Sequence, residues 1–398
     1  MIEATCRAGL ADRHLLDPQD QVAPHPDGRR FAVGPMSLVE NSLENKPEIA
    51  ETPGKEDAFQ VAKVSVAPMM EWTDRHCRFF LRQFSSRIRL YTEMIHASAI
   101  QRGDAARLLR FSPGERPLAL QLGGSDPRVL ADAARRAEDA GYDEVNLNCG
   151  CPSDRVRSGS FGACLMLRPA LVAECVSAMK QAVRVPVTVK FRIGVVEREA
   201  EGSSAQALAR GQEFDARDAA ALEHFARSLL AAGADALVVH ARKAVLGGLS
   251  PHENRTVPPL RYDAVAQLRQ ALGAVPVIVN GGLRTCDEVL SALERFDGVM
   301  IGREAYHRPQ LLGELQAALH PSDPPPPGPA GVLEAMREYA LRETAGGTPL
   351  HAITRHMLGL LNGRPGAKAL RHTLSAEVQR GGSVTEIFNR ASELACSS

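Results

Sequence analysis

Eight short runs of apolar and β-branched residues recur between residues 64 and 301, with helical patterns between them. Strand-length runs that alternate with helices are typical of βα units, which build a parallel sheet. Eight such units predict an α/β fold with a (β/α)8 barrel of the TIM type, in which the loop after every strand lies at one end. The expected strands are Val64–Val66, Leu90–Thr92, Leu118–Leu122, Glu144–Leu147, Pro186–Val189, Ala236–Val239, Pro276–Val279 and Gly298–Ile301.

We expect an extension before this barrel, and a linker and a second domain after it. Residues 1–60 mix proline, glycine and charged residues without sustained periodicity, which predicts a disordered N-terminal extension. Residues 61–320 hold the barrel, and the proline-rich segment 321–329 predicts a stiff linker. Helical spacing resumes in residues 330–398, so we expect a small C-terminal helical domain there.

Composition narrows the class of protein. No run of about 18 apolar residues occurs, so no membrane span is expected. Eight cysteines without dense spacing indicate a reducing compartment, and therefore the cytoplasm, rather than a disulfide framework. With 47 basic and 47 acidic residues the formal net charge is zero, so any site for a polyanion must be local. The arginines between positions 75 and 89 cluster, and a solvated helix face is the simplest interpretation of them.

Glycines follow the last two expected strands. Asn280-Gly281-Gly282 comes after the seventh strand, and Gly302-Arg303 comes after the eighth. TIM barrels commonly bind phosphate here, because glycine lets backbone N–H groups approach an anion. Either pair alone could serve only to make a tight turn, but two pairs on adjacent strands favour a phosphate site to which Arg303 adds a charged contact.

Three polar residues at other strand ends suggest a larger ligand. Lys190 ends an apolar strand, where an ammonium without a partner would be costly to bury. The pyrimidine edge of a flavin would suit it, with Gln121 as a neutral hydrogen-bond partner and His240 on the next strand. A lone histidine at such a position is more often a hydrogen-bonded core residue, but His240 is not alone.

Two cysteines follow the fourth strand in the sequence Asn148-Cys149-Gly150-Cys151-Pro152. No second cysteine pair has zinc-ligand spacing, so no metal site is expected, and a redox disulfide is the weaker alternative. Pro152 would fix the turn, so that Cys151 could act as a proton donor or nucleophile. A buried, inert thiol is the competing interpretation for Cys151 and the preferred one for Cys149. Asn148 could hydrogen-bond the edge of a base.

Three longer motifs resemble the bacterial tRNA-dihydrouridine synthases, specifically their A-type subgroup. They are APMMEWTDRHCR at 67–78, ALQLGGS at 119–125 and NCGCPSDRV at 148–156. Shorter matches follow in consistent order, including HARKA at 240–244, GREAY at 302–306 and RHMLGL at 355–360.

This resemblance implies an FMN-dependent enzyme that uses NADPH to reduce the C5–C6 double bond of a D-loop uridine in tRNA, at positions 20 and 20a. It implies hydride transfer from flavin N5 to C6 and a proton from Cys151 to C5. It further implies that Asn148, Arg242, Lys243 and Arg355 contact tRNA, together with the C-terminal helices. The FMN-contacting positions that it implies are Pro68, Met69, Met70, Gln121, Lys190, His240, Asn280, Gly281, Gly282, Gly302 and Arg303.

Some features depart from this pattern, and two other functions stay open. Residues 196–217 form a longer and more charged stretch than expected after the fifth strand, and Val245 stands where an aromatic is usual. An FMN barrel reductase of a small unsaturated substrate would share the phosphate site without needing Arg242 or Lys243. A non-catalytic RNA-binding module would not need Lys190 and Cys151. No protein partner is expected.

Overall fold

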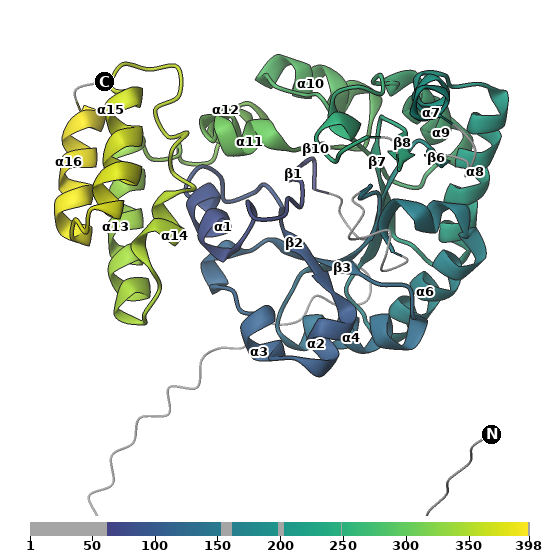
Figure 1. The fold of residues 1–398 in the computed structure, drawn as a ribbon, viewed down its shortest axis with the longest axis horizontal. Helices are drawn as coiled ribbons and strands as arrows, with labels where there is room; N and C mark the ends of the chain where they lie inside the picture. The colour runs from purple at the N-terminus through teal and green to yellow at the C-terminus, as the bar shows by residue number, and fades with distance from the viewer. Residues whose placement is uncertain (1–61, 153–160, 198–202, 248, 397–398) are drawn as a thin grey trace, which may run out of the picture. The chain divides into compact units, whose positions relative to one another are not determined.

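The computed structural model describes residues 62–152, 161–197, 203–247 and 249–396, so the expected extension at 1–60 lies outside the described residues. Its main sheet has eight parallel strands in the order β1-β10-β9-β7-β5-β4-β3-β2 (Figure 1). Val66 N donates to Arg89 O (2.9 Å) and Arg89 N donates to Val64 O (3.2 Å), so β1 also meets the start of β2. The predicted (β/α)8 barrel is therefore confirmed. The strands are β1 Val64–Val66, β2 Leu90–His96, β3 Leu118–Gly123, β4 Glu144–Cys149, β5 Val187–Arg192, β7 Ala236–His240, β9 Val277–Asn280 and β10 Gly298–Ile301.

The helices follow the strands as predicted, and most of them surround the sheet in Figure 1. The helices and 3₁₀ segments of the barrel are α1 Arg75–Arg82, α2 Ala97–Arg102, α3 Ala105–Leu108, η1 Pro113–Glu115, α4 Pro127–Asp139, η2 Gly162–Leu167, α6 Pro169–Ala182, α7 Ser204–Gln212, α8 Ala216–Ala231, η3 Glu253–Arg255, α9 Tyr262–Leu272, α10 Cys286–Arg295, α11 Arg303–His307 and α12 Gln310–Leu319. No described helix is long and apolar enough to cross a membrane.

Local side-chain bonds explain where several of these helices begin and end. Asp74 caps α1 by accepting hydrogen bonds from the backbone N–H groups of His76 (3.0 Å) and Cys77 (2.9 Å). Two of the approaches to the strands use glycine in the left-handed region, with φ of 93° at Gly141 after α4 and 95° at Gly233 after α8. These turns send the chain from each helix into the next strand, as the sequence predicted.

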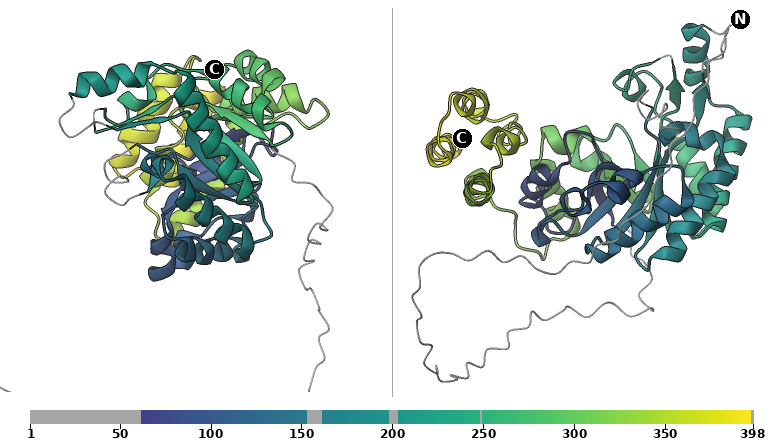
Figure 2. Two further views of the ribbon diagram at one scale, coloured as in Figure 1. Left: turned by 90° about the vertical axis from the view of Figure 1, so that its right-hand side faces the viewer. Right: turned by 60° about the horizontal axis from the view of Figure 1, so that its bottom comes forward.

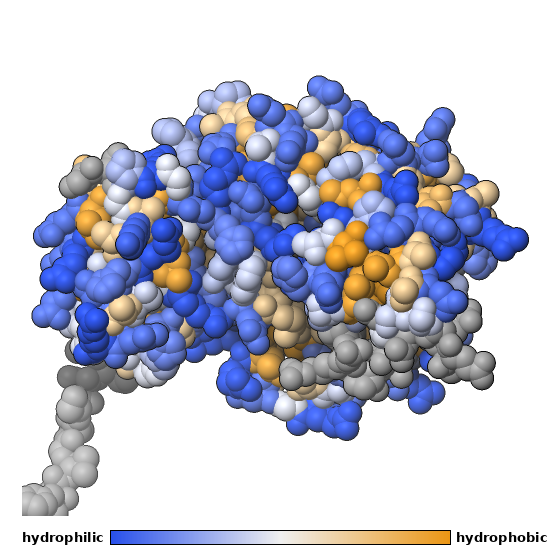
Figure 3. All heavy atoms as spheres, turned by 45° about the horizontal axis from the view of Figure 1, so that its top comes forward, coloured by the Kyte–Doolittle hydropathy of each residue, from blue (hydrophilic) through white to orange (hydrophobic). Residues whose placement is uncertain are grey.

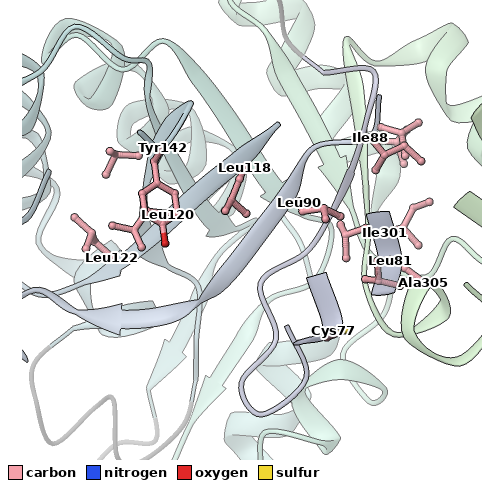
Figure 4. Packing of buried hydrophobic residues seen from close by; sticks show 14 of the residues in the cluster. Cys77, Leu81, Ile88, Leu90, Leu118, Leu120, Leu122, Tyr142, Ile301 and Ala305 are labelled. Carbon is pink, nitrogen blue, oxygen red and sulfur yellow. The ribbon is translucent and has the colours of Figure 1, made fainter. Parts of the chain in front are cut away.

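The two faces of the strands differ in polarity, because successive side chains alternate between the barrel interior and the helices. Outward residues such as Leu118, Leu120 and Leu122 are fully buried in the layer between strands and helices, part of which Figure 4 shows. Inward positions hold a small apolar cluster that includes Tyr91 and Met300. They also hold an unusual number of polar side chains, and the functional site is built on these.

A second, two-stranded parallel sheet was not predicted. It pairs β6 Val195–Glu197, just after β5, with β8 Ala244–Leu246, just after β7, and so lies beyond the carboxyl ends of the barrel strands. Helix α7, from the long stretch at 196–217, packs on this sheet. A Cβ added at Gly211 would come 2.6 Å from Val245 Cγ2, so this glycine allows the close approach. Part of the stretch, residues 198–202, lies outside the description.

The C-terminal helices form a bundle that contacts the barrel through α1 (Figures 1 and 2). Tyr339 stacks on Phe79 with ring centroids 4.0 Å apart, and its hydroxyl lies 2.8 Å from His76 Nδ1. Arg75 and Glu343 form an ion pair at 2.5 Å across the same contact. The helices of this region are α13 Pro329–Ala345, α14 Leu350–Thr354, α15 Ala367–His372, the π-helical turn η4 Thr373–Glu377 and α16 Val384–Cys396.

The surface of the described residues is mainly hydrophilic. On the face drawn in Figure 3, apolar residues form separate patches with hydrophilic residues around them. Met70 is the most exposed of the large hydrophobic side chains at 56%, and it belongs to the loop after β1. An apolar side chain left exposed at the mouth of a barrel is available to a ligand.

Candidate active site

The turn after β4 separates the two cysteines. Cys149 is the last residue of β4, and its side chain points outward and lies fully buried against the helices. Burial raises the pKa of its thiol well above the ordinary value. Cys151 lies beyond the strand end and is partly exposed. Asn148 Oδ1 accepts the backbone N–H groups of Gly150 and Cys151, both at 3.1 Å. The amide of Asn148 therefore shapes the turn that carries Cys151.

Lys190 and His240 lie beside this turn on the next two strands of the barrel. Pairing sets Lys190 opposite Asn148 and His240 opposite Asn280, so all four side chains point inward at the carboxyl end. Lys190 Nζ lies 3.0 Å from Asn280 Oδ1, and Asn280 Nδ2 donates to Met300 O at 2.7 Å. Burial, and then the charge of Arg192, lower the pKa of the Lys190 ammonium to about 7.

His240 is neutral for the same reasons. Burial, followed by the charges of Arg192 and Lys190, lowers the pKa of the imidazole well below its usual range. A neutral imidazole offers one donor and one acceptor nitrogen to a ligand instead of a third positive charge. The prediction that His240 belongs to a site, and not simply to the core, fits this position.

Glycines open the same end of the barrel at β9 and β10. Gly281 has a φ of 122° and Gly282 a φ of 77°, and a Cβ added at Gly281 would lie 2.8 Å from His240 Cδ2. A Cβ added at Gly302 would meet no atom within 4 Å. The first two glycines are thus required by the turn itself, whereas Gly302 borders open space beside Arg303.

Cations collect around this opening, and we call them the mouth cations. None of them has a carboxylate within 4 Å among the described residues. The guanidinium of Arg303 is one cause, after burial, of the lowered pKa values of Arg242 and Arg255. Unneutralised cations at short range repel one another, so an anion bound here would stabilise the whole group. The mouth cations are Lys190, Arg192, Arg242, Arg255 and Arg303.

Comparison with known proteins agrees with this geometry. The family model described as dihydrouridine synthase (Dus) matches residues 65–394, which include the barrel and most of the C-terminal helices. The chain belongs to the dihydrouridine synthase family. It is 48% identical over 347 residues to the tRNA-dihydrouridine(20/20a) synthase of Pseudomonas putida, covering 87% of this chain and 98% of that protein. The protein of the same name from Escherichia coli is 44% identical over 343 residues, covering 86% and 94%.

Two of the residues predicted to contact tRNA bond to other parts of this dihydrouridine synthase family member. Lys243 is only 2% exposed, and its ammonium forms an ion pair with Asp218 at 2.7 Å. This ion pair ties Lys243 to α8, and its contact with tRNA stays a prediction. Arg355 extends from the C-terminal region to donate to the backbone oxygen of Glu71, next to Met70.

The residues predicted after β1 lie in a tight loop. Met69 O accepts the N–H groups of Trp72 (3.1 Å) and Thr73 (2.9 Å), and Glu71 adopts a φ of 65°, which is unusual for a residue other than glycine. Pro68 and Met69 are partly buried in this loop. Arg355 therefore contacts the same loop that was predicted to touch a flavin.

Sequence reasoning missed two of the mouth cations. Arg192 Nε donates to Gly150 O (3.0 Å), and its Nη1 donates to Lys243 O (3.0 Å) and Asn254 O (2.9 Å). It stands two residues after Lys190, and strand periodicity alone could have placed it in the interior. Arg255 offered only a weaker signal, because it ends a short 3₁₀ segment whose position depends on the buried side chain of Asn254.

Proposed function

We propose that this family member reduces the C5–C6 double bond of a D-loop uridine in tRNA to 5,6-dihydrouridine, at positions 20 and 20a. The observation that carries the proposal is the Cys151 turn, bonded to Asn148 and next to Lys190 at the carboxyl end of the barrel. The relatives named for these positions support it, since the family match spans the barrel and the C-terminal helices.

The chemistry of the mouth fits flavin mononucleotide, which is the cofactor that we propose. Lys190 is an inward cation without a described carboxylate partner, and Gly302 borders open space in which a phosphate would meet Arg303. A bound flavin, itself reduced by NADPH, would supply the hydride for C6 of the uridine. The residues that would hold it are Pro68, Met69, Met70, Gln121, Lys190, His240, Asn280, Gly281, Gly282, Gly302 and Arg303.

Cys151 supplies the proton in this proposal. Saturating the C5–C6 bond requires a hydride at C6 and a proton at C5, so an acid must lie within reach of the base. The thiol of Cys151 donates its proton to C5 and regains one from solvent before the next turnover. Asn148 has committed its oxygen to the turn and one N–H to Gln121, so the remaining N–H is the donor left for a uracil oxygen.

Two of the mouth cations, Arg242 and Arg255, and the C-terminal helices would hold the tRNA. A uridine must leave its stack to reach the mouth of a barrel, and the surrounding phosphates then lie close to the protein. Arg242 and Arg255 suit phosphate contacts because no described carboxylate neutralises them. Arg355 would connect bound tRNA to the loop after β1, because it donates to Glu71 O in that loop. Binding by phosphate contacts weakens steeply with added salt. A tRNA and NADPH substrate pair implies a cytoplasmic enzyme.

The test compares wild type with Cys151→Ala. Purified wild type should carry a yellow flavin and should form dihydrouridine at positions 20 and 20a when incubated with NADPH and unmodified tRNA. Cys151→Ala should keep the flavin and lose product formation by two orders of magnitude or more, since one proton-transfer group contributes on the order of 10²- to 10⁴-fold. An undiminished rate in the flavin-bound variant would remove Cys151 from the mechanism.

A matched assay with free uridine separates the alternative function. A reductase of small unsaturated substrates should reduce free uridine or a simple enone at a rate comparable with tRNA. Activity confined to tRNA, together with loss of activity at high salt, supports the proposal. A protein that binds tRNA without any flavin would instead be a non-catalytic RNA-binding module.

A further inference from the structure

The interior of the barrel holds a continuous row of polar side chains that leads to the Cys151 turn. Glu144, Asn146 and Asn148 occupy the three inward positions of β4, and each is less than 9% exposed. Gln121 on β3 and Thr188 on β5 flank Asn146 on the two sides, as the strand pairing requires. Barrel interiors of this fold are usually filled by Val, Ile and Leu, so a polar row needs an explanation.

At its lower end, which is the end farther from Cys151, the row begins with the hydrogen-bond acceptor Glu144. The Glu144 carboxylate receives hydrogen bonds from Arg89 Nη1, the Tyr91 hydroxyl and the Thr188 hydroxyl, each at 2.5 Å. Burial, and then the carboxylate, raise the pKa of Tyr91 well above its usual value, so the phenol stays a donor. A carboxylate only accepts, and the hydroxyl proton of Thr188 is therefore committed to Glu144.

From Thr188 upward each bond fixes the direction of the next. Thr188 Oγ1 accepts from Asn146 Nδ2, Asn146 Oδ1 accepts from Gln121 Nε2, and Gln121 Oε1 accepts from Asn148 Nδ2, all at 2.8 Å. Asn148 Oδ1 then accepts the two N–H groups of the Cys151 turn. The upper end offers only donors and the lower end only acceptors, so both ends require the same orientation of all three amides.

We infer that Glu144, Thr188 and Asn146 are positioning residues, which fix the amides of Gln121 and Asn148 and, through Asn148, the turn that carries Cys151. Their role in catalysis rests on the proposed function, but their effect on the turn does not. A flipped Asn148 would set its NH2 group against two backbone N–H groups, leaving donors without acceptors in a buried site. Apolar residues of similar volume would fill the barrel without this risk, so the row is better explained by positioning than by stability.

The experiment compares Thr188→Val with Thr188→Ser in the flavin-bound protein. Valine keeps the volume and removes the hydroxyl, whereas serine keeps the hydroxyl and removes a methyl group. Thr188→Val should lower kcat for tRNA reduction on the order of ten- to a hundred-fold, the scale of a small misplacement of catalytic groups. Thr188→Ser should recover most of the lost kcat.

A second readout needs no activity. The rate at which iodoacetamide modifies Cys151, followed by mass spectrometry of its peptide, should change at least about threefold in Thr188→Val and not in Thr188→Ser. Exposed Cys396 serves as the internal reference. Thr373→Val is the matched control, because Thr373 is also buried and its hydroxyl also donates to a glutamate, Glu377, at 3.3 Å. This control should leave the Cys151 rate unchanged.

The outcomes separate this inference from the proposed function. If wild type makes no dihydrouridine, the proposed function fails, and the alkylation rates still test the positioning of the turn. Wild-type rates in Thr188→Val, or equal losses in the valine and serine variants, would overturn the inference. Should Thr188→Val fail to fold, Glu144→Gln tests the same point, because an amide no longer forces Thr188 to donate. A wild-type alkylation rate and kcat in Glu144→Gln would likewise overturn it.

Discussion

Arg78 on α1 and the cations at the barrel mouth differ in whether a carboxylate lies close to them. Arg78 is buried, and its guanidinium lies 2.8 Å from the carboxylate of Glu115, which has no exposed surface. Lys190, Arg192 and Arg303 are also wholly or partly buried, yet no described carboxylate lies within 4 Å of them. Removing one partner of a buried ion pair destabilises the fold, whereas a buried cation at the mouth without a carboxylate partner is suited to binding an anionic ligand.

The largest expected effect breaks a pair on the scaffold side. Arg78→Met should lower the free energy of unfolding by roughly 3–5 kcal/mol, because it leaves the Glu115 carboxylate buried without its partner. Urea unfolding of the flavin-free protein measures the change. The double variant Arg78→Met, Glu115→Gln should recover a large part of the loss, since both charges are then gone. Additive losses in the double variant would show that the pair is not coupled.

The second prediction concerns the mouth. Lys190→Met should lower tRNA reduction about 100-fold, or abolish flavin binding, yet stabilise the flavin-free protein by ~1 kcal/mol or more, because a costly buried ammonium is removed. The folded pKa of about 7 lies below the ordinary 10.5, so the folded state binds fewer protons and wild-type stability should rise between pH 7 and 10.5. Thermal unfolding across this range checks the sign. A destabilised variant with the wild-type pH slope contradicts it.

A smaller effect is expected at the rim of the same site. Arg303→Ala should weaken flavin binding about tenfold, the loss expected from one charged contact to a phosphate. The change in Kd can be measured by flavin fluorescence, with riboflavin, which lacks the phosphate, as the control ligand. Riboflavin should bind wild type and variant equally. An equal loss for both ligands would place Arg303 away from the phosphate.

The smallest effect is expected for an exposed pair on the scaffold side. Arg87 and Asp323 form a bidentate contact at 2.8 Å, but the Arg87 side chain is 57% exposed. Arg87→Ala should lower the free energy of unfolding far less than Arg78→Met does, because water screens exposed pairs. The shift should shrink further in 0.5 M salt. A loss as large as that of Arg78→Met would show that pairing matters and burial does not.

Much of the barrel could be predicted because its signals are local. Strands of four or five apolar residues, glycine after α4 and α8, and capping residues such as Asp74 each act within a few positions of the chain. The small sheet of β6 and β8 was missed, because its three-residue strands come directly after β5 and β7 and do not begin a βα unit of their own. The ion pair of Lys243 with Asp218 could not be predicted, because Asp218 lies on a helix that the sequence did not place next to it.

The arginine cluster at 75–89 also shows that the sequence alone does not reveal which charged residues are buried. Its interpretation as a solvated helix face was wrong for Arg78, which is buried, and for Arg82, whose guanidinium donates to main-chain oxygens of residues 85, 88, 115 and 117. Nothing in the spacing of these arginines distinguishes them from surface residues. Some of their acceptors are local, but others, such as Glu115 O at a separation of 33, come from a loop more than thirty positions away.

The sequence by itself determined the eight βα units, the glycine turns at β9 and β10 and the candidate cysteine, because alternation, φ preferences and short motifs are properties of neighbouring residues. Only the tertiary structure decided which charges are paired and which way the amides of the interior point. Those properties depend on strand register and on closure of the barrel, which bring Glu144, Thr188 and Gln121 together from three strands. Hydrogen-bond direction then follows from the groups that meet there, and no single segment of the chain contains that information.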